Sequence, residues 1–132
     1  MLVADASLVV DYLLDDGPRG VWSAAQIESV PYLHAPHLLD LEVAAAAREG
    51  VERGFVLDER ASTAVRDLAD LRVKRYPVTG LLERIWDLRD VQTPYDAAYV
   101  ALAEALGLPL ATTDRRLART RGHGVEIRAF EG

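Results

Sequence analysis

Short apolar runs alternate along this chain with longer segments whose apolar residues recur every three or four positions. A continuous apolar run is typical of a strand buried on both faces, and the longer spacing is typical of a helix that buries one face. We predict strands at residues 2–4, 32–35, 72–76, 108–112 and 125–130. We predict helices at residues 7–14, 18–27, 38–49, 58–71, 79–89, 94–106 and 115–121.

Local signals mark the ends of several predicted helices. Ser7, Asp58 and Thr79 are predicted as N-caps, because short polar side chains accept hydrogen bonds from the free amides of a first turn. Pro94 suits the first position of a helix, and Gly107 suits the left-handed residue that follows a last turn. These signals agree with the boundaries that the apolar pattern indicates.

Strands separated by helices predict parallel βαβ units. We therefore expect an α/β fold, a three-layer α/β/α sandwich around a central, mostly parallel sheet of four or five strands. The chain has 132 residues, half of them hydrophobic, and no repeat or low-complexity linker interrupts it. It is therefore predicted to be a single domain, residues 1–132. Ligands of such sheets bind beyond the carboxyl ends of the strands.

Four acidic residues occupy positions where acids are unusual. Asp5 and Asp114 lie just past the ends of two predicted strands, so their carboxylates converge if those two strands are neighbours. Glu42 and Asp96 lie in the first turns of helices that are otherwise apolar or small on the same face. Asp40, two positions before Glu42, faces the opposite side and is predicted to be solvated or to cap its helix.

Each acid also has a purely structural explanation. Asp5 and Asp114 can cap the helices that follow them. Asp96 is the third residue after Thr93, which resembles a capping box. Glu42 can pair with an arginine. Taken singly, these explanations are at least as good as a functional one, and only the four acids together favour a site.

Four carboxylates at one edge of a sheet repel one another unless a cation lies among them. The chain has no cysteine, which excludes thiolate chemistry and Cys-ligated zinc. Oxygen ligands favour Mg²⁺, or Mn²⁺, over zinc. Such ions activate water and neutralise charge on a phosphoryl group. The residues alone therefore predict a metal-dependent phosphodiesterase or phosphatase.

Four motifs in order resemble those of PIN-domain nucleases, and most closely the VapC toxins of bacterial type II toxin–antitoxin systems. They are VADAS at 3–7, the acid Glu42, PYDAAY at 94–99 and LATTD at 110–114. The resemblance extends over the whole chain, although residues 50–92 carry no family signature. It implies a PIN-like fold and a Mg²⁺-dependent endoribonuclease that cleaves RNA (tRNA, rRNA or mRNA) with metal-activated water.

The same resemblance implies roles for individual residues. Asp5 and Asp96 would be the most direct metal ligands, and Asp114 and Glu42 would complete the catalytic site directly or through water. The resemblance also implies that Ser7 and Thr112 would orient the metal ligands or their waters.

The resemblance also implies partners. It predicts a homodimer, and a cognate VapB-type antitoxin whose C-terminal segment covers the acidic site. An arginine of such a partner often points at these carboxylates, and a guanidinium can replace the charge of the cation.

Net charge and targeting signals refine this prediction. The formal charge of −6 by itself argues against a basic nucleic-acid-binding face, yet four of the acids belong to the predicted site. Arg115, Arg116 and Arg119 are candidates for RNA phosphate contacts, with a solvated basic face as the alternative.

We expect no signal peptide and no membrane span, and hence a cytoplasmic protein.

Other functions remain open at this point. One is a PIN-domain RNA-processing nuclease without a toxin role. Another is a non-catalytic, metal-stabilised PIN-like binding module, against which the four intact acids argue. A response-regulator receiver also gathers acids at strand ends, but it needs a lysine after a late strand, and Lys74 is the only lysine here.

Overall fold

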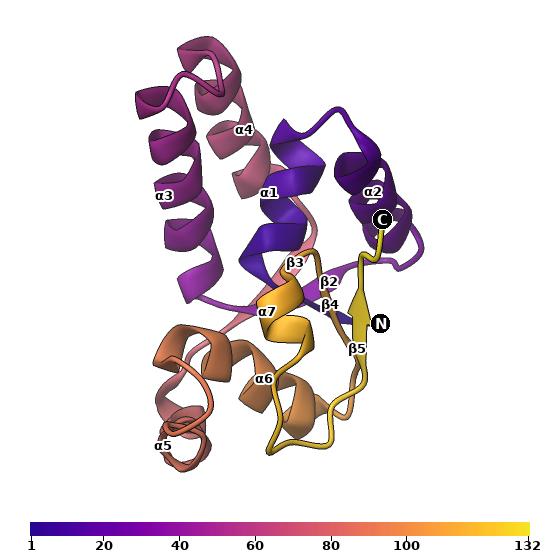
Figure 1. Cartoon of the computed structure of the whole chain (residues 1–132), viewed down its shortest axis with the longest axis vertical. Coiled ribbons are helices and arrows are strands. Elements are labelled where there is room, and N and C mark those ends of the chain that lie inside the picture. Colours follow the sequence, from indigo (N-terminus) through magenta and orange to yellow (C-terminus); the bar gives the residue numbers. More distant parts are fainter.

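The computed structural model describes all residues, 1–132, and contains one five-stranded sheet in the order β3-β2-β1-β4-β5 (Figure 1). Every pair of neighbouring strands is parallel. The strands are β1 (Val3–Ala4), β2 (Leu33–Pro36), β3 (Val73–Tyr76), β4 (Leu110–Thr112) and β5 (Ile127–Ala129). The predicted strands are therefore all present, and the sheet is fully parallel.

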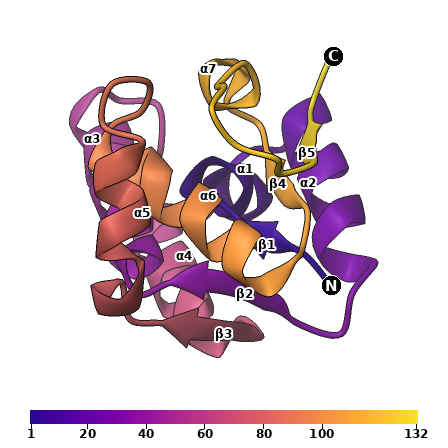
Figure 2. The same ribbon diagram turned by 90° about the horizontal axis from the view of Figure 1, so that it is seen from below.

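Helices cover both faces of the sheet (Figure 2). They are α1 (Ala6–Leu14), α2 (Pro18–Glu28), α3 (Leu38–Glu52), α4 (Asp58–Asp70), α5 (Leu82–Asp87), α6 (Pro94–Leu106) and α7 (Arg115–Ala118). On one face α6 packs on the three central strands with α5 against it, and on the other α1 packs among α2, α3 and α4. The predicted three-layer α/β/α architecture is confirmed. None of the helices combines the length and apolar character needed to cross a bilayer.

Strand order positions the functional edge of the sheet. The chain runs outward from β1 through β2 to β3 and then returns to place β4 on the other side of β1. In this register Ala4 lies opposite Ala111, so β1 and β4 end side by side. This switch in strand order is where parallel α/β sheets bind ligands. Asp5 and Asp114 follow these two strand ends, as the sequence predicted.

The core lies between the strands and the helices on both faces of the sheet, and α6 is the most deeply buried helix. Every residue from 97 to 103 is buried, which confirms that α6 is a largely buried helix. Its small alanines let the helix approach the sheet closely, while Tyr99 and Leu102 fill the remaining volume. At its ends, Thr93 accepts a hydrogen bond from the Asp96 amide and Gly107 adopts φ 65°, as predicted.

Several predicted helix starts are wrong. The N-cap of α1 is Asp5, which accepts a hydrogen bond from the Leu8 amide, and not Ser7. Asp58 is the first residue of α4, with Leu57 in the cap position. Thr79 begins a separate 3₁₀ turn (Thr79–Leu81) before α5, so the predicted single helix is divided. Adjacent polar residues compete for a cap position, and tertiary contacts decide between them.

Two further differences concern α7 and Asp40. The helix α7 ends at Ala118, three residues before the predicted end. Asp40 does not cap its helix, and although its side chain is partly exposed, Arg75 of β3 binds both of its oxygens at 2.8 and 2.9 Å. This pair joins α3 to the edge strand of the sheet, a contact that spacing along α3 could not indicate.

Candidate active site

Asp5 lies at the bottom of the candidate site, where a single residue separates β1 from α1. Its side chain is buried, with the residue 5% exposed, and its carboxylate accepts hydrogen bonds at both oxygens. Ser7 Oγ and the Leu8 amide donate to Oδ1 at 2.7 and 3.1 Å, and Thr112 Oγ1 donates to Oδ2 at 2.7 Å. Protein donors therefore fix the orientation of this carboxylate.

Hydroxyl groups connect Asp5 to the end of β4. The Asp114 amide donates to Thr112 Oγ1 at 2.9 Å, and the Thr113 amide donates to Ser7 Oγ at 3.1 Å. Asp114 itself caps α7 and accepts the Arg116 amide at 2.8 Å. The two strand ends are thus joined through Ser7 and Thr112, the residues predicted to orient the ligands.

Glu42 reaches the site from α3, and its hydrogen-bond partner is a tyrosine. The hydroxyl of Tyr99 donates to Glu42 Oε1 at 2.6 Å, and Tyr99 is 2% exposed in the middle of α6. The predicted alternative of an arginine partner for Glu42 is wrong. Sequence reasoning missed Tyr99, although it follows Asp96 by three positions and so shares that face of α6.

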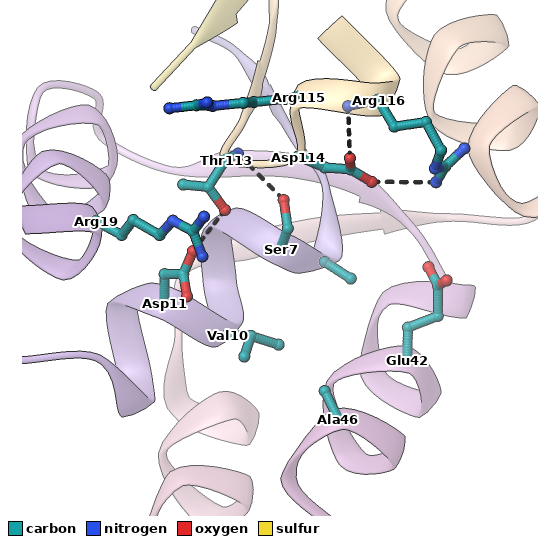
Figure 3. Close-up of a pocket in the computed structure, with 11 residues that line it drawn as sticks. Ser7, Val10, Asp11, Arg19, Glu42, Ala46, Thr113, Asp114, Arg115 and Arg116 are labelled. Atoms are coloured by element: carbon teal, nitrogen blue, oxygen red, sulfur yellow. Dashed lines mark hydrogen bonds and ion pairs between the residues drawn. The ribbon is translucent and has the colours of Figure 1, made fainter. Parts of the chain in front are cut away.

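Asp96 and Asp114 share one cation. Arg116 Nη1 donates to Asp96 Oδ2 at 2.5 Å, and Arg116 Nη2 donates to Asp114 Oδ2 at 3.1 Å. Figure 3 shows the Arg116 side chain turned back over Asp114. Arg116 was predicted to contact RNA phosphate, and in this structure it contacts these two acids.

An open pocket of about 520 Å³ lies beside Glu42, Asp114 and Arg116 (Figure 3), whereas Asp5 and Asp96 do not line it. Glu42 and Asp114 line it on one side, and Arg19 of α2 and Arg115 line it as well. Asp11 also lines it and accepts the Thr113 hydroxyl at 2.5 Å. No sequence signal marked Arg19 or Asp11 as part of the site, because neither belongs to a motif.

The predicted basic residues do not all lie at the pocket. Arg115 lines it, but Arg119 lines two other hollows of the surface, one beside Phe130 and one beside Gln92. Arg119 therefore does not join the other two at the acids. Arg119 shares the first of these hollows with Arg115 and the second with Arg116, so its contact with RNA stays a prediction.

Burial makes the two inner carboxylates poor acids. Loss of water raises the pKa of Asp5 to about 7, against the opposing effect of its hydrogen bonds, and the charge of Asp114 raises it further. Burial also raises the pKa of Glu42, and the charge of Asp96 adds to this effect. Negative charge is therefore costly here, and a cation would be stabilised.

The oxygen atoms of these side chains suit a hard divalent cation as ligands. The four acids and their neighbouring hydroxyls offer only oxygen atoms, and no histidine lines the pocket. Arg116 already supplies positive charge between Asp96 and Asp114. As the side chains stand, no three of the His, Asp and Glu residues are grouped around one ion position. The chemistry of the donors fits Mg²⁺ or Mn²⁺.

The chain is similar to known proteins over most of its length. The family model described as PIN domain matches residues 2–123. A protein named VapC ribonuclease Mb0985, from Mycobacterium bovis, is 43% identical over 120 residues, which cover 91% of each chain.

Solved structures share the fold. The structure of Mycobacterium tuberculosis VapC20, a toxin described as cleaving the sarcin-ricin loop, superposes with a TM-score of 0.69 at 14% identity, covering 89% of this chain and 93% of that one. The Rickettsia felis VapBC2 complex bound to promoter DNA gives 0.66 at 10% identity, covering 99% and 100%. From its sequence match across most of its length, this chain belongs to the PIN-domain family and is similar to VapC ribonucleases.

Proposed function

We propose that this chain is a Mg²⁺-dependent endoribonuclease that acts as the toxin of a type II toxin–antitoxin system. The observation that carries the proposal is the edge of the sheet where Asp5 and Asp114 meet, with Glu42 and Asp96 facing them from α3 and α6. An acidic, oxygen-only site of this kind suits phosphodiester chemistry. Similarity to a VapC ribonuclease over 91% of the chain supports RNA as the substrate.

Four residues would hold the ion, Mg²⁺ or Mn²⁺. Asp5 and Asp96 would do so most directly, with Asp114 and Glu42 binding directly or through water. When bound, such an ion lowers the pKa of a coordinated water and neutralises charge on a phosphate.

The other side chains of the site support these four. Ser7 and Thr112 hold the Asp5 carboxylate in one orientation through two bonds of 2.7 Å. Tyr99 does the same for Glu42. Arg115, at the mouth of the pocket, suits a contact with an RNA phosphate beside the acids.

The similarity to VapC proteins also supports a proposal about the partners of this chain. The Rickettsia felis neighbour is described as a VapBC pair, which supports a VapB-type antitoxin for this chain. Acidic side chains at an open pocket suit capture by a partner's arginine.

We also propose a homodimer, because α5 and the start of α6 expose large apolar side chains, Leu82, Trp86 and Tyr95. A dimer mass by light scattering would support this, and a monomer mass would contradict it. Because cellular RNA is its substrate, the protein would act in the cytoplasm.

Cleavage of RNA is the direct test of the proposed function. We expect the purified chain to cut structured RNA with Mg²⁺, and the activity to disappear with EDTA or in Asp96→Asn. Asp40→Asn is the matched control, since Asp40 pairs with Arg75 and contacts none of the four acids or Arg116. Full activity of Asp96→Asn would contradict the proposed site.

Expression in cells separates the remaining functions. A toxin arrests growth when expressed alone, and Asp5→Asn relieves the arrest. Cleavage without growth arrest would favour an RNA-processing nuclease. RNA binding without any cleavage would favour a binding module that uses the metal only for structure.

A further inference from the structure

Arg116 is the one cationic side chain that contacts any of the four acids of the site. It binds Asp96 at 2.5 Å and Asp114 at 3.1 Å, while Asp5 and Glu42 have no ion-pair partner. The contact with Asp96 joins residues twenty positions apart, so it bridges α7 and α6. Asp96 is only 16% exposed at its side chain, whereas Arg116 is 63% exposed. Asp96 is therefore the more buried partner, and the guanidinium reaches it from the solvent side.

Two acids from different parts of the fold determine where the Arg116 side chain lies. Arg116 lies in the single turn of the four-residue helix α7, whose N-cap is Asp114, and it reaches from there to Asp96 on α6. Its neighbour Arg115 has the same type of side chain and lines the same pocket, yet makes no ion pair.

We propose that Arg116 is an internal counter-cation that occupies the place of the divalent ion between Asp96 and Asp114 and must leave when the ion binds. The proposal rests on the metal site of the proposed function. Arg116 would hold the two acids together in the metal-free protein and would compete with Mg²⁺ for them. The residue would thereby set the ion concentration that the site requires.

Electrostatic repulsion sets the Arg116 guanidinium and a divalent ion in competition for the same two carboxylates. Asp96 Oδ2 accepts the guanidinium at 2.5 Å, and Mg²⁺ needs carboxylate oxygens at about 2.1 Å from its own position. A guanidinium and a divalent ion held by the same two carboxylates would lie a few ångströms apart and repel strongly. The long side chain of Arg116 is mostly exposed and has room to swing away, whereas Asp96 is largely buried on α6 and Asp114 is held as the N-cap of α7.

Ion affinity tests this competition without an activity assay. We would titrate Mn²⁺ into the full chain, following free Mn²⁺ by electron paramagnetic resonance. We expect Arg116→Gln to bind Mn²⁺ more tightly than wild type, on the order of tenfold. The matched control is Arg115→Gln, which removes the same charge one residue away without touching Asp96 or Asp114. Arg116→Lys keeps the charge and should lie between wild type and Arg116→Gln.

Thermal unfolding supplies the second readout. In EDTA, Arg116→Gln should unfold at a lower temperature than Arg115→Gln, because Asp96 and Asp114 lose their counter-charge. Saturating Mn²⁺ should remove this difference. A merely structural arginine would lower the unfolding temperature equally with and without the ion, and that result would overturn the proposal.

The outcomes separate this inference from the proposed function. Equal Mn²⁺ affinity of Arg116→Gln and Arg115→Gln, or weaker binding by Arg116→Gln, overturns the role of Arg116 alone, provided that Asp96→Asn abolishes binding. Failure of the wild-type chain to bind Mn²⁺ overturns the metal site and this inference together.

Discussion

The inner and outer halves of the site use the same chemical group in opposite ways. Asp5 is buried and its partners are neutral hydroxyls and one amide. Asp96 and Asp114 lie nearer to solvent and share a charged partner, Arg116. The inner carboxylate is therefore fixed in position and costly to ionise, whereas the outer pair is already compensated and can exchange its partner. The inner carboxylate thus supplies a fixed position, and the outer pair supplies negative charge whose partner can change.

The largest effect that distinguishes the two halves concerns pH. The pKa of Asp5 rises from 3.8 to about 7 on folding, so the folded chain holds a proton that the unfolded chain has lost in this range. The contribution of Asp5 to the free energy of unfolding is thus full below about pH 4. It is lost as pH rises through 7, by up to ~4 kcal/mol. Burial of Glu42 and Asp11 acts in the same direction.

Urea unfolding in EDTA between pH 4 and 8 measures this contribution. The stability of the wild-type chain should fall with rising pH, and Asp5→Asn should flatten much of the slope. An equal slope in Asp5→Asn would show that the inner carboxylate is not the costly one. Stability that rises over the same range would contradict the comparison altogether.

A smaller effect concerns the connection between the two halves. Thr112→Val keeps the shape of a fully buried side chain but removes the donor to Asp5 and the acceptor for the Asp114 amide. We expect the free energy of unfolding to fall by about 1–3 kcal/mol. Cleavage rate should fall by roughly 10- to 100-fold, as for other residues that orient ligands.

Thr112→Ser provides the check on this interpretation, since it restores the hydroxyl and omits the methyl group. Recovery of most of the cleavage rate by Thr112→Ser would show that the hydrogen bonds matter. If Thr112→Ser were as slow as Thr112→Val, packing of the methyl group would be the cause instead.

The smallest expected effect is at Tyr99. Tyr99→Phe removes only the hydroxyl that donates to Glu42, at a cost of about 0.5–1.5 kcal/mol in stability. Glu42 would then lose its fixed orientation, so Mn²⁺ affinity should weaken by roughly tenfold. Tyr12→Phe is the matched control, since Tyr12 packs against the core without a hydroxyl partner. Unchanged Mn²⁺ affinity in Tyr99→Phe would place Glu42 outside the ion site.

Much of the fold follows from local pattern. Apolar runs and helical spacing predicted all five strands and the order of the helices, because each element buries a face that its own residues define. The prediction was less accurate at helix starts. Ser7 and Asp5 can both cap α1, and Asp5 does so with its other oxygen held by Thr112, more than a hundred residues away.

The candidate site divides in a similar way. Its four acids were found from sequence because each breaks the apolar pattern of its own element, and parallel topology brings strand ends to one edge. Ser7 and Thr112 beside Asp5 were named from the family resemblance, but the partners of the other three acids, Tyr99 and Arg116, were not found. Tyr99 is on the element predicted for it, yet its contact with Glu42 depends on how α6 docks beside α3. The pairing of Asp40 with Arg75 depends in the same way on the place of β3.

The sequence by itself determined the elements, the parallel sheet, the position of the four acids and the likeness to PIN-domain nucleases. These properties depend on residue types at short spacing, which the chain carries whether or not it is folded. Only the tertiary structure decided that Asp5 is desolvated, that Tyr99 holds Glu42, and that Arg116 bridges Asp96 and Asp114. Burial and pairing across the molecule depend on which helices pack together. The spacing of residue types along the chain does not encode that packing.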